Sequence, residues 1–184
     1  MQNNSSYEEA AMVCHTNRRE EELSRLRALE QRSGRRIRVM RMSGEPVACI
    51  DLKMEVWTAE DANFPRSALS EVHASLVLGA LYPFVPPRVE VKTRVFNPLV
   101  DPQGRLHFGL DWSAGCHLDN LACRVFKILA FDEGALSLGT VVNDAAAEWY
   151  QTARSLLPSV FPSDGLAGVG PDAAHSFSAI GGGL

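Results

Sequence analysis

The sequence lacks the features of a membrane protein or an exported protein. No apolar run approaches the roughly 20 residues that a membrane helix requires. The first six residues are polar and have neither the basic region nor the apolar region of an export signal. These absences predict an intracellular, cytoplasmic protein without a membrane partner.

Cysteine is also scarce, and the cysteines are not closely spaced in pairs along the sequence. The four copies are Cys14, Cys49, Cys116 and Cys123. Their spacing contains no C-x-x-C pair, which argues against a disulfide scaffold and against a structural zinc site. The adjacent Cys116 and His117 also match no familiar zinc spacing when they are combined with Cys123 and His107. We therefore predict no metal and no cofactor.

The chain carries no excess of positive charge. Its formal net charge is −4, so bulk electrostatics give no reason to expect a nucleic-acid partner. Arginines nevertheless gather in the N-terminal part of the chain. They are Arg18, Arg19, Arg25, Arg27, Arg35, Arg36, Arg38 and Arg41. A solvated helix face followed by an exposed strand explains this group, and a docking surface for an acidic protein partner is the alternative.

What the sequence does contain is the pattern of one α+β domain. Leu23, Leu26 and Leu29 recur at helical spacing and predict a helix over residues 17–32, which Ser33 and Gly34 end. Alternating and β-favouring residues then predict four antiparallel strands. The predicted strands cover residues 37–42, 47–57, 74–78 and 88–94.

Two further helices are predicted after the strands. An apolar stripe with a period of 3.6 residues predicts a central helix that packs on the sheet. The stripe consists of Leu118, Leu121, Ala122, Val125, Ile128 and Leu129. A C-terminal helix is predicted over residues 143–157. Residues 1–16 are expected to be a flexible arm, residues 17–157 the domain, and residues 158–184, which are rich in Gly, Ser and Pro, a flexible tail.

The centre of the chain carries the most informative motifs. Residues 82–89 read Tyr-Pro-Phe-Val-Pro-Pro-Arg-Val, residues 96–106 read Phe-Asn-Pro-Leu-Val-Asp-Pro-Gln-Gly-Arg-Leu, and Trp112 and Ser113 follow. This order resembles the centre of the ubiquitin-conjugating enzyme (UBC) family, and residues 143–150 resemble a segment later in that family. The resemblance implies a UBC-like α+β fold, with an N-terminal helix, a four-stranded antiparallel meander, a central helix packed on the sheet and a C-terminal helix.

The resemblance places the catalytic positions of the family at residues that lack its chemistry. Asn97, Pro98 and Leu99 stand where the family has His-Pro-Asn, and His107 takes the place of the cysteine that carries ubiquitin. Conjugation needs a thiolate and, beside it, a side-chain amide that stabilises the oxyanion. His107 and Leu99 supply neither group. General-base catalysis by His107 is an alternative, but no adjacent nucleophile is evident.

Cys116 is the candidate for a displaced nucleophile. It lies near the predicted start of the central helix, where a helix N-terminus favours a thiolate. The alternative is a cysteine that only packs near the helix start. Cys123 lies within the predicted helix and is expected to be an ordinary core thiol.

We predict a non-catalytic, UBC-like protein that acts as a binding partner or accessory subunit. The resemblance implies a ubiquitin-like modifier, an active conjugating enzyme or an activating enzyme as its partner, and hence a hetero-oligomer such as a heterodimer. The retained C-terminal helix indicates a lineage such as the accessory components of bacterial ubiquitin-like conjugation systems. Two alternatives stay open. One is an active conjugating enzyme that uses Cys116, and the other is an RWD-like scaffold domain, which the match at residues 143–150 opposes.

The predicted partner-binding residues lie in the first helix and in two loops. They are Arg18, Arg19, Arg25, Phe64, Pro65, Tyr82, Phe84 and Pro86. By resemblance, the arginines are candidates for contact with an activating enzyme. Proline-fixed aromatic loops present apolar area at low entropic cost, and Phe64 is the sharpest candidate because no core stripe includes it. Its alternative is packing against the sheet. Tyr82, Phe84 and Trp112 are also expected to anchor their turn through burial of their rings.

Overall fold

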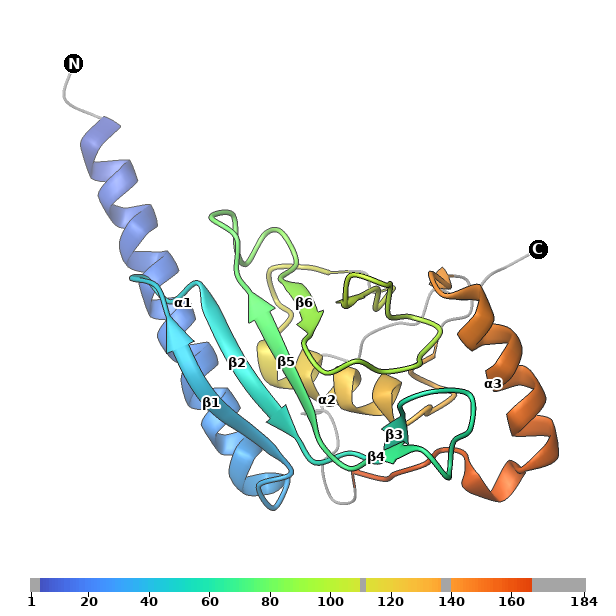
Figure 1. Ribbon diagram of the computed structural model, residues 1–184. Coiled ribbons are helices and arrows are strands. Elements are labelled where there is room, and N and C mark those ends of the chain that lie inside the picture. The colour runs from blue at the N-terminus through green and yellow to red at the C-terminus, as the bar shows by residue number, and fades with distance from the viewer. Residues whose placement is uncertain (1–3, 110–111, 137–139, 167–184) are drawn as a thin grey trace.

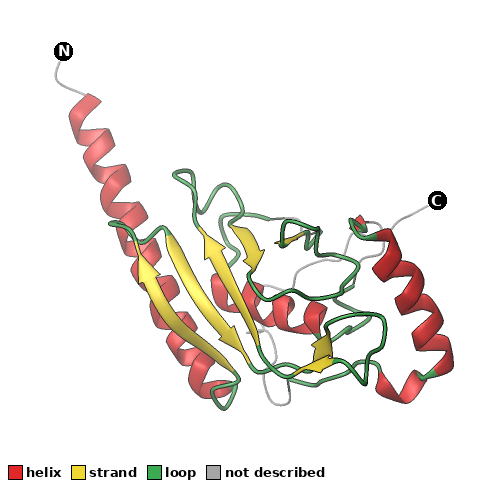
Figure 2. Cartoon of the chain, viewed as in Figure 1, coloured by secondary structure: helices red, strands yellow, loops and turns green. Residues whose placement is uncertain are grey.

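The computed structural model describes residues 4–109, 112–136 and 140–166, with side chains from Arg18 onward. Figure 1 shows α1 (Asn4–Arg32) and α2 (Leu118–Leu129) on one face of a twisted sheet, with α3 (Asp144–Leu156) beyond the far end of that sheet. Figure 2 shows the same arrangement coloured by type of element. In the described ranges, no helix combines the length and the hydropathy that a bilayer crossing needs. The predicted α+β class is confirmed.

The main sheet has five strands in the order β1-β2-β5-β6-β7, and all neighbours are antiparallel. The strands are β1 (Ile37–Ser43), β2 (Cys49–Met54), β5 (Val72–Val77), β6 (Arg88–Val91) and β7 (Arg105–Leu106). A separate two-stranded sheet contains β3 (Thr58–Ala59) and β4 (Ala68–Leu69). The main sheet differs from the predicted count of four because the hairpin after β6 returns and pairs for two residues. Leu106 pairs with Val89, and Arg105 pairs with Glu90.

Side chains alternate across the sheet as its pleat requires. Along β2, Ile50, Leu52 and Met54 are buried, and the residues between them are partly exposed. α2 covers the buried face, and all six residues of its predicted apolar stripe are buried. The predicted central helix on the sheet is therefore confirmed.

The first helix is longer than the leucine spacing predicts. Leu26 and Leu29 are buried as that spacing requires, but α1 begins at Asn4 rather than at residue 17. The predicted flexible arm of residues 1–16 thus differs from the structure, in which residues 4–16 are helical. The run Glu-Glu-Ala-Ala-Met at residues 8–12 consists of strong helix formers, which accounts for the extension.

The hydrophobic core extends to a group of aromatic side chains where the β3–β4 region meets α3 and the end of α2. This group consists of Trp57, Phe64, Phe131, Trp149, Tyr150 and Phe161, called here the aromatic cluster. Phe64 is only 4% exposed, and its ring centroid lies 5.1 Å from that of Trp57 and 5.9 Å from that of Phe161. The prediction that Phe64 docks a partner is wrong, because other rings already cover it. The structure instead has the alternative, in which the Phe64 ring packs inside the domain.

Residues 158–166 belong to the folded domain and not to the predicted tail. Phe161 packs in the aromatic cluster, and the Ser163 N–H donates to the carbonyl of Ala130 at 2.8 Å. The Asp164 carboxylate accepts from the Trp57 N–H at 3.1 Å and pairs with Arg36. The predicted boundary after residue 157 therefore differs from the structure, in which the folded domain includes residues 158–166. The rest of the predicted tail lies outside the described residues.

Phe64→Ala should lower the free energy of unfolding by about 3–5 kcal/mol, because it empties the centre of the aromatic cluster. Phe84→Ala is the matched control, since the Phe84 side chain is 69% exposed. This control should change the free energy by about 0.5 kcal/mol or less. Urea denaturation followed by tryptophan fluorescence measures both variants. Equal losses of stability in the two variants would contradict the assignment of Phe64 to the core.

Candidate functional site

The hairpin between β6 and β7 positions Asn97, Leu99 and His107, which the sequence predicts at the catalytic positions of the family. The Asp101 Oδ1 atom accepts from the backbone N–H groups of Gln103 and Arg105, at 2.9 and 2.8 Å. Gly104 has φ +82°, and a Cβ atom there would lie 2.5 Å from the carbonyl oxygen of Val91. Only glycine fits this turn without displacing β6. The hairpin therefore keeps its Asp-x-x-Gly geometry.

This hairpin brings His107 beside Leu99. The His107 backbone N–H donates to the Leu99 carbonyl at 2.8 Å. Leu99 is fully buried, and so is Asn97, whose side-chain amide donates to the carbonyl of Ile128 in α2 at 2.9 Å. The Asn97 side-chain oxygen also accepts from the Leu99 N–H at 3.0 Å. These two residues fix the backbone and present no group to a substrate.

The His107 imidazole faces the surface beside one carboxylate. Its side chain is 45% exposed, and its Nε2 atom lies 3.2 Å from the Asp101 Oδ2 atom. Burial acts to raise the pKa of Asp101, but hydrogen bonds from the Arg105 N–H and from His107 outweigh burial and lower it. In the described part of the chain, no thiol or hydroxyl forms a hydrogen bond with the His107 ring. The pair can therefore hold or move a proton, but it lacks a protein nucleophile.

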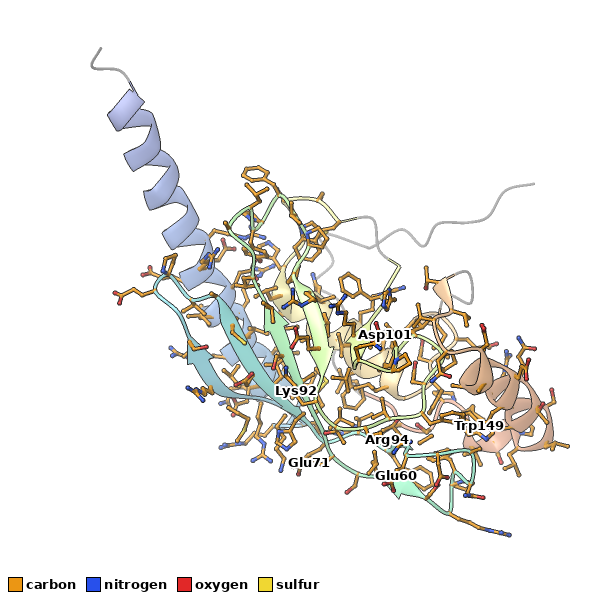
Figure 3. The ribbon with its side chains drawn as sticks, turned by 45° about the horizontal axis from the view of Figure 1, so that its top comes forward. Glu60, Glu71, Lys92, Arg94, Asp101 and Trp149 are labelled. Carbon is orange, nitrogen blue, oxygen red and sulfur yellow. The ribbon has the colours of Figure 1, made fainter. Side chains whose placement is uncertain are left out.

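A groove of about 790 Å³ lies against the same hairpin. Its apolar lining includes Val91, Val95, Phe96 and Val100. Figure 3 labels Glu60, Lys92, Arg94 and Asp101, which bring charges of both signs to its walls from three segments of the chain. Within the described ranges, neither Glu60 nor Arg94 has an ion-pair partner. The groove thus offers apolar and charged contacts to a bound chain, but its walls contain no cysteine.

Cys116 lies in a separate corner at the start of α2. It is 8% exposed, and its Sγ atom is 3.4 Å from the Ser113 backbone nitrogen and 3.6 Å from the Ser113 hydroxyl. The Cys116 carbonyl accepts from the Arg18 guanidinium at 2.6 Å. Between the described residues, no contact joins Cys116 to His107. The structure therefore does not bring the displaced-nucleophile candidate to the hairpin.

Cys49 and Cys123 are the other cysteines with described side chains. Burial, followed by the charge of Asp119, raises the pKa of Cys123 to about 11. Burial and then Asp51 raise the pKa of the half-buried Cys49. The expectation that Cys123 is a core thiol is confirmed. Across the described part of the chain, no group of three or more His, Cys, Asp or Glu side chains has the arrangement of a metal site.

The predicted docking arginines of α1 point into the protein. Arg19 is 7% exposed and donates to the carbonyl of Val47 and, at 3.0 Å, to that of Gly79. Arg18 pairs with the buried Glu22. Arg25 lies 3.5 Å from the buried Asp119 of α2. The assignment to a partner surface is wrong for Arg19, which is buried and held by two backbone carbonyls. The Arg18 guanidinium is already held by the buried Glu22 and by the Cys116 carbonyl.

The loop of residues 79–87 contains a group of exposed apolar side chains. Phe84 is 69% exposed, Leu81 is 66% exposed and Val85 is 47% exposed, and Pro86 is exposed beside them. We call these four residues the apolar loop. Leu81 and Val85 were not among the predicted binding residues, since an aliphatic residue beside prolines has no distinctive sequence signal.

The neighbouring residues of the loop anchor it. Tyr82 is buried, its ring centroid lies 6.1 Å from that of Trp112, and the Trp112 indole donates to the Pro83 carbonyl at 2.7 Å. The anchoring role is thus confirmed for Tyr82 and Trp112 and is wrong for Phe84. The prediction that Tyr82 contacts a partner is wrong, because its ring is buried. Pro65, next to the buried Phe64, is half-buried.

Comparison with known proteins supports the fold and does not extend to an activity. No protein-family model matches the chain, and no curated protein matches it. Among solved structures, 104 chains match. One is described as the "crystal structure of a putative ubiquitin conjugating enzyme from Plasmodium yoelii". It has a TM-score of 0.54 and 11% sequence identity, and the match covers 78% of this chain and 89% of that one. The chain therefore has a UBC-like fold.

Cys123 should be almost inert to iodoacetamide at pH 8. A pKa of about 11 leaves a thiolate fraction on the order of 200-fold below that of a free cysteine. Because the folded-state pKa is raised, labelling should increase as the pH rises toward 11. Peptide mass spectrometry measures labelling, and unfolded protein in urea is the control.

Cys116 should also label slowly in the folded protein, because it is 8% exposed. Labelling of Cys116 in the native protein as fast as in urea would contradict its packed position. Such a result would also favour the hypothesis that Cys116 is a displaced nucleophile.

Proposed function

We propose that this protein is a non-catalytic, cytoplasmic accessory subunit of a ubiquitin-like conjugation pathway. It pairs with an active conjugating enzyme or with a ubiquitin-like modifier. The observation that carries the proposal is the hairpin, where His107 lies beside the buried Leu99 while the UBC-like fold around them is retained. A domain that keeps this fold without the nucleophile is most simply useful as a binding surface.

The chemistry of the hairpin argues against conjugation. A thiolate is both a good nucleophile and a good leaving group, whereas an acyl-imidazole on His107 would hydrolyse far faster than a thioester. Leu99 has no side-chain donor for the oxyanion. The Asn97 amide is buried and donates to Ile128. No residue of the hairpin takes over either missing role.

The apolar loop is the docking surface that this function needs. Its exposed Leu81, Phe84 and Val85 lie together, and prolines restrict the backbone around them. A restricted loop loses little entropy when a partner covers it, and aromatic side chains are common among the residues that dominate binding energy. The ion pair of Arg18 with Glu22 and the hydrogen bonds of Arg19 to backbone carbonyls leave the apolar loop as the better candidate of the predicted surfaces.

The active-enzyme alternative requires Cys116 to leave its packed position. Its sulfur lies against Ser113 and its carbonyl is held by Arg18. The RWD-like alternative has to account for α3, which follows the family-like segment at residues 143–150. Both alternatives are outcomes of the experiments below.

No thioester should form when the protein is incubated with an activating enzyme, a ubiquitin-like modifier and ATP from one conjugation system. Gel electrophoresis with and without reductant detects the adduct, and an active conjugating enzyme from the same system is the positive control. A reductant-sensitive adduct that is lost in Cys116→Ser and kept in Cys123→Ser would establish the active-enzyme alternative instead.

Phe84→Ala should weaken binding to the partner at least about tenfold, as for a residue that dominates an interface. Isothermal titration against the conjugating enzymes and modifiers of the same system measures the affinity. Leu156→Ala is the matched control, because Leu156 is 74% exposed but lies on α3. If the protein binds none of these proteins, or if both variants bind equally well, the apolar loop is not the docking surface.

A further inference from the structure

A buried carboxylate outside the candidate site joins three segments of the fold. Glu22 of α1 is fully buried, and its Oε1 atom accepts from the Tyr82 hydroxyl at 2.7 Å. The same oxygen lies 3.2 Å from Nδ1 of His117 and 2.8 Å from Nε of Arg18. Its other oxygen, Oε2, accepts from the Leu118 backbone N–H at 2.8 Å. We call these four side chains, together with the Leu118 N–H, the Glu22 clasp.

The groups around Glu22 stabilise its carboxylate in the ionised form. A buried charge is tolerated only when it is paired and hydrogen-bonded, and Arg18 supplies the opposite charge. Burial acts to lower the pKa of Arg18, but the nearby Glu22, Tyr82 and Glu21 together outweigh burial and raise it. Burial and then Glu22 raise the pKa of Tyr82, so its hydroxyl keeps the proton that it donates.

The first turn of α2 adds a further reason for the negative charge. The N–H groups there have no partner within the helix and carry partial positive charge, which favours a carboxylate such as Glu22. The exposed Glu21 also faces this corner, since it lies 3.9 Å from the His117 ring and 4.0 Å from Arg18. Arg19 lies over the Tyr82 ring at 6.0 Å.

The Glu22 clasp also holds the loop of residues 79–87, because Tyr82 belongs to that loop. Tyr82 is the buried residue between the exposed Leu81 and Phe84. Among the described residues, Arg19 at the Gly79 carbonyl and Trp112 at the Pro83 carbonyl also hold this loop against the rest of the domain. Of these three contacts, only that of the Tyr82 hydroxyl is made to a side chain, Glu22, that also binds the start of α2.

We propose that the Glu22 clasp is a conformational coupling, which holds the loop of residues 79–87 in its observed shape and ties that shape to the start of α2. A partner that moves the loop therefore changes the first turn of α2, and a change at Glu22 alters the loop. The coupling extends the proposed function and rests on it in one respect, the role of the loop as a docking surface. Its test needs no partner, so the two proposals can fail separately.

Amide hydrogen exchange of the free, full-length protein, measured by NMR, tests the coupling. Glu22→Gln keeps the size of the side chain and removes its charge. It should accelerate exchange at least about tenfold both in residues 79–87 and at Leu118, because hydrogen bonds to a charged acceptor are lost. Tyr82→Phe keeps the ring against Trp112 and should accelerate exchange in the loop. Glu20→Gln, on an exposed neighbour in α1, should leave both regions unchanged.

Exchange in β2 and β5 separates coupling from a general loss of stability. The proposal expects the amides of these central strands to exchange as in the unmodified protein. Two results overturn it. One is a folded Glu22→Gln or Tyr82→Phe variant whose loop exchanges as before, and the other is acceleration of β2 and β5 by as much as the loop. Tyr82→Phe alone decides the question if Glu22→Gln does not fold.

Discussion

Burial of α2 against the sheet is the interaction on which the other features of this protein depend. Its apolar stripe covers the inner face of the central strands, and both of its ends hold segments from elsewhere in the chain. Near its C-terminal end, the Ile128 carbonyl accepts from the Asn97 amide. At its N-terminal end, the Leu118 N–H donates to Glu22. The same helix therefore supports the hairpin region and the clasp.

The packing of the hairpin region explains how Asn97 and Leu99 fit a UBC-like fold. Both are buried parts of the packing between the hairpin region and α2, where the Asn97 amide donates to the Ile128 carbonyl. Asp101 and Gly104 form the turn that places His107 on the surface.

Charged side chains of α1 and exposed apolar side chains occupy different parts of this protein. Arg18, Arg19 and Arg25 of α1 bind acceptors outside that helix, namely the Cys116 carbonyl, the Val47 and Gly79 carbonyls, and the Asp119 carboxylate. These ion pairs and hydrogen bonds join α1 to the β1–β2 turn, the loop before β6 and α2. Exposed apolar area instead gathers in the apolar loop around Phe84. Because Tyr82 anchors that loop from within, its exposed side chains stand on a fixed backbone.

The sequence by itself determined the α+β class, the central helix and the hairpin, because periodicity and turn chemistry are local properties of a chain. It also identified His107, Asn97 and Leu99 as the places to examine. Only the tertiary structure decided the fates of Phe64 and Phe84, which are buried and exposed in the reverse of what their sequence contexts indicate. Whether a lone ring in a loop is covered depends on segments far away in the chain, such as Phe161 over Phe64. The inward direction of Arg18 and Arg19 has the same cause, since their acceptors come from distant turns and from Glu22, whose burial no local pattern reveals.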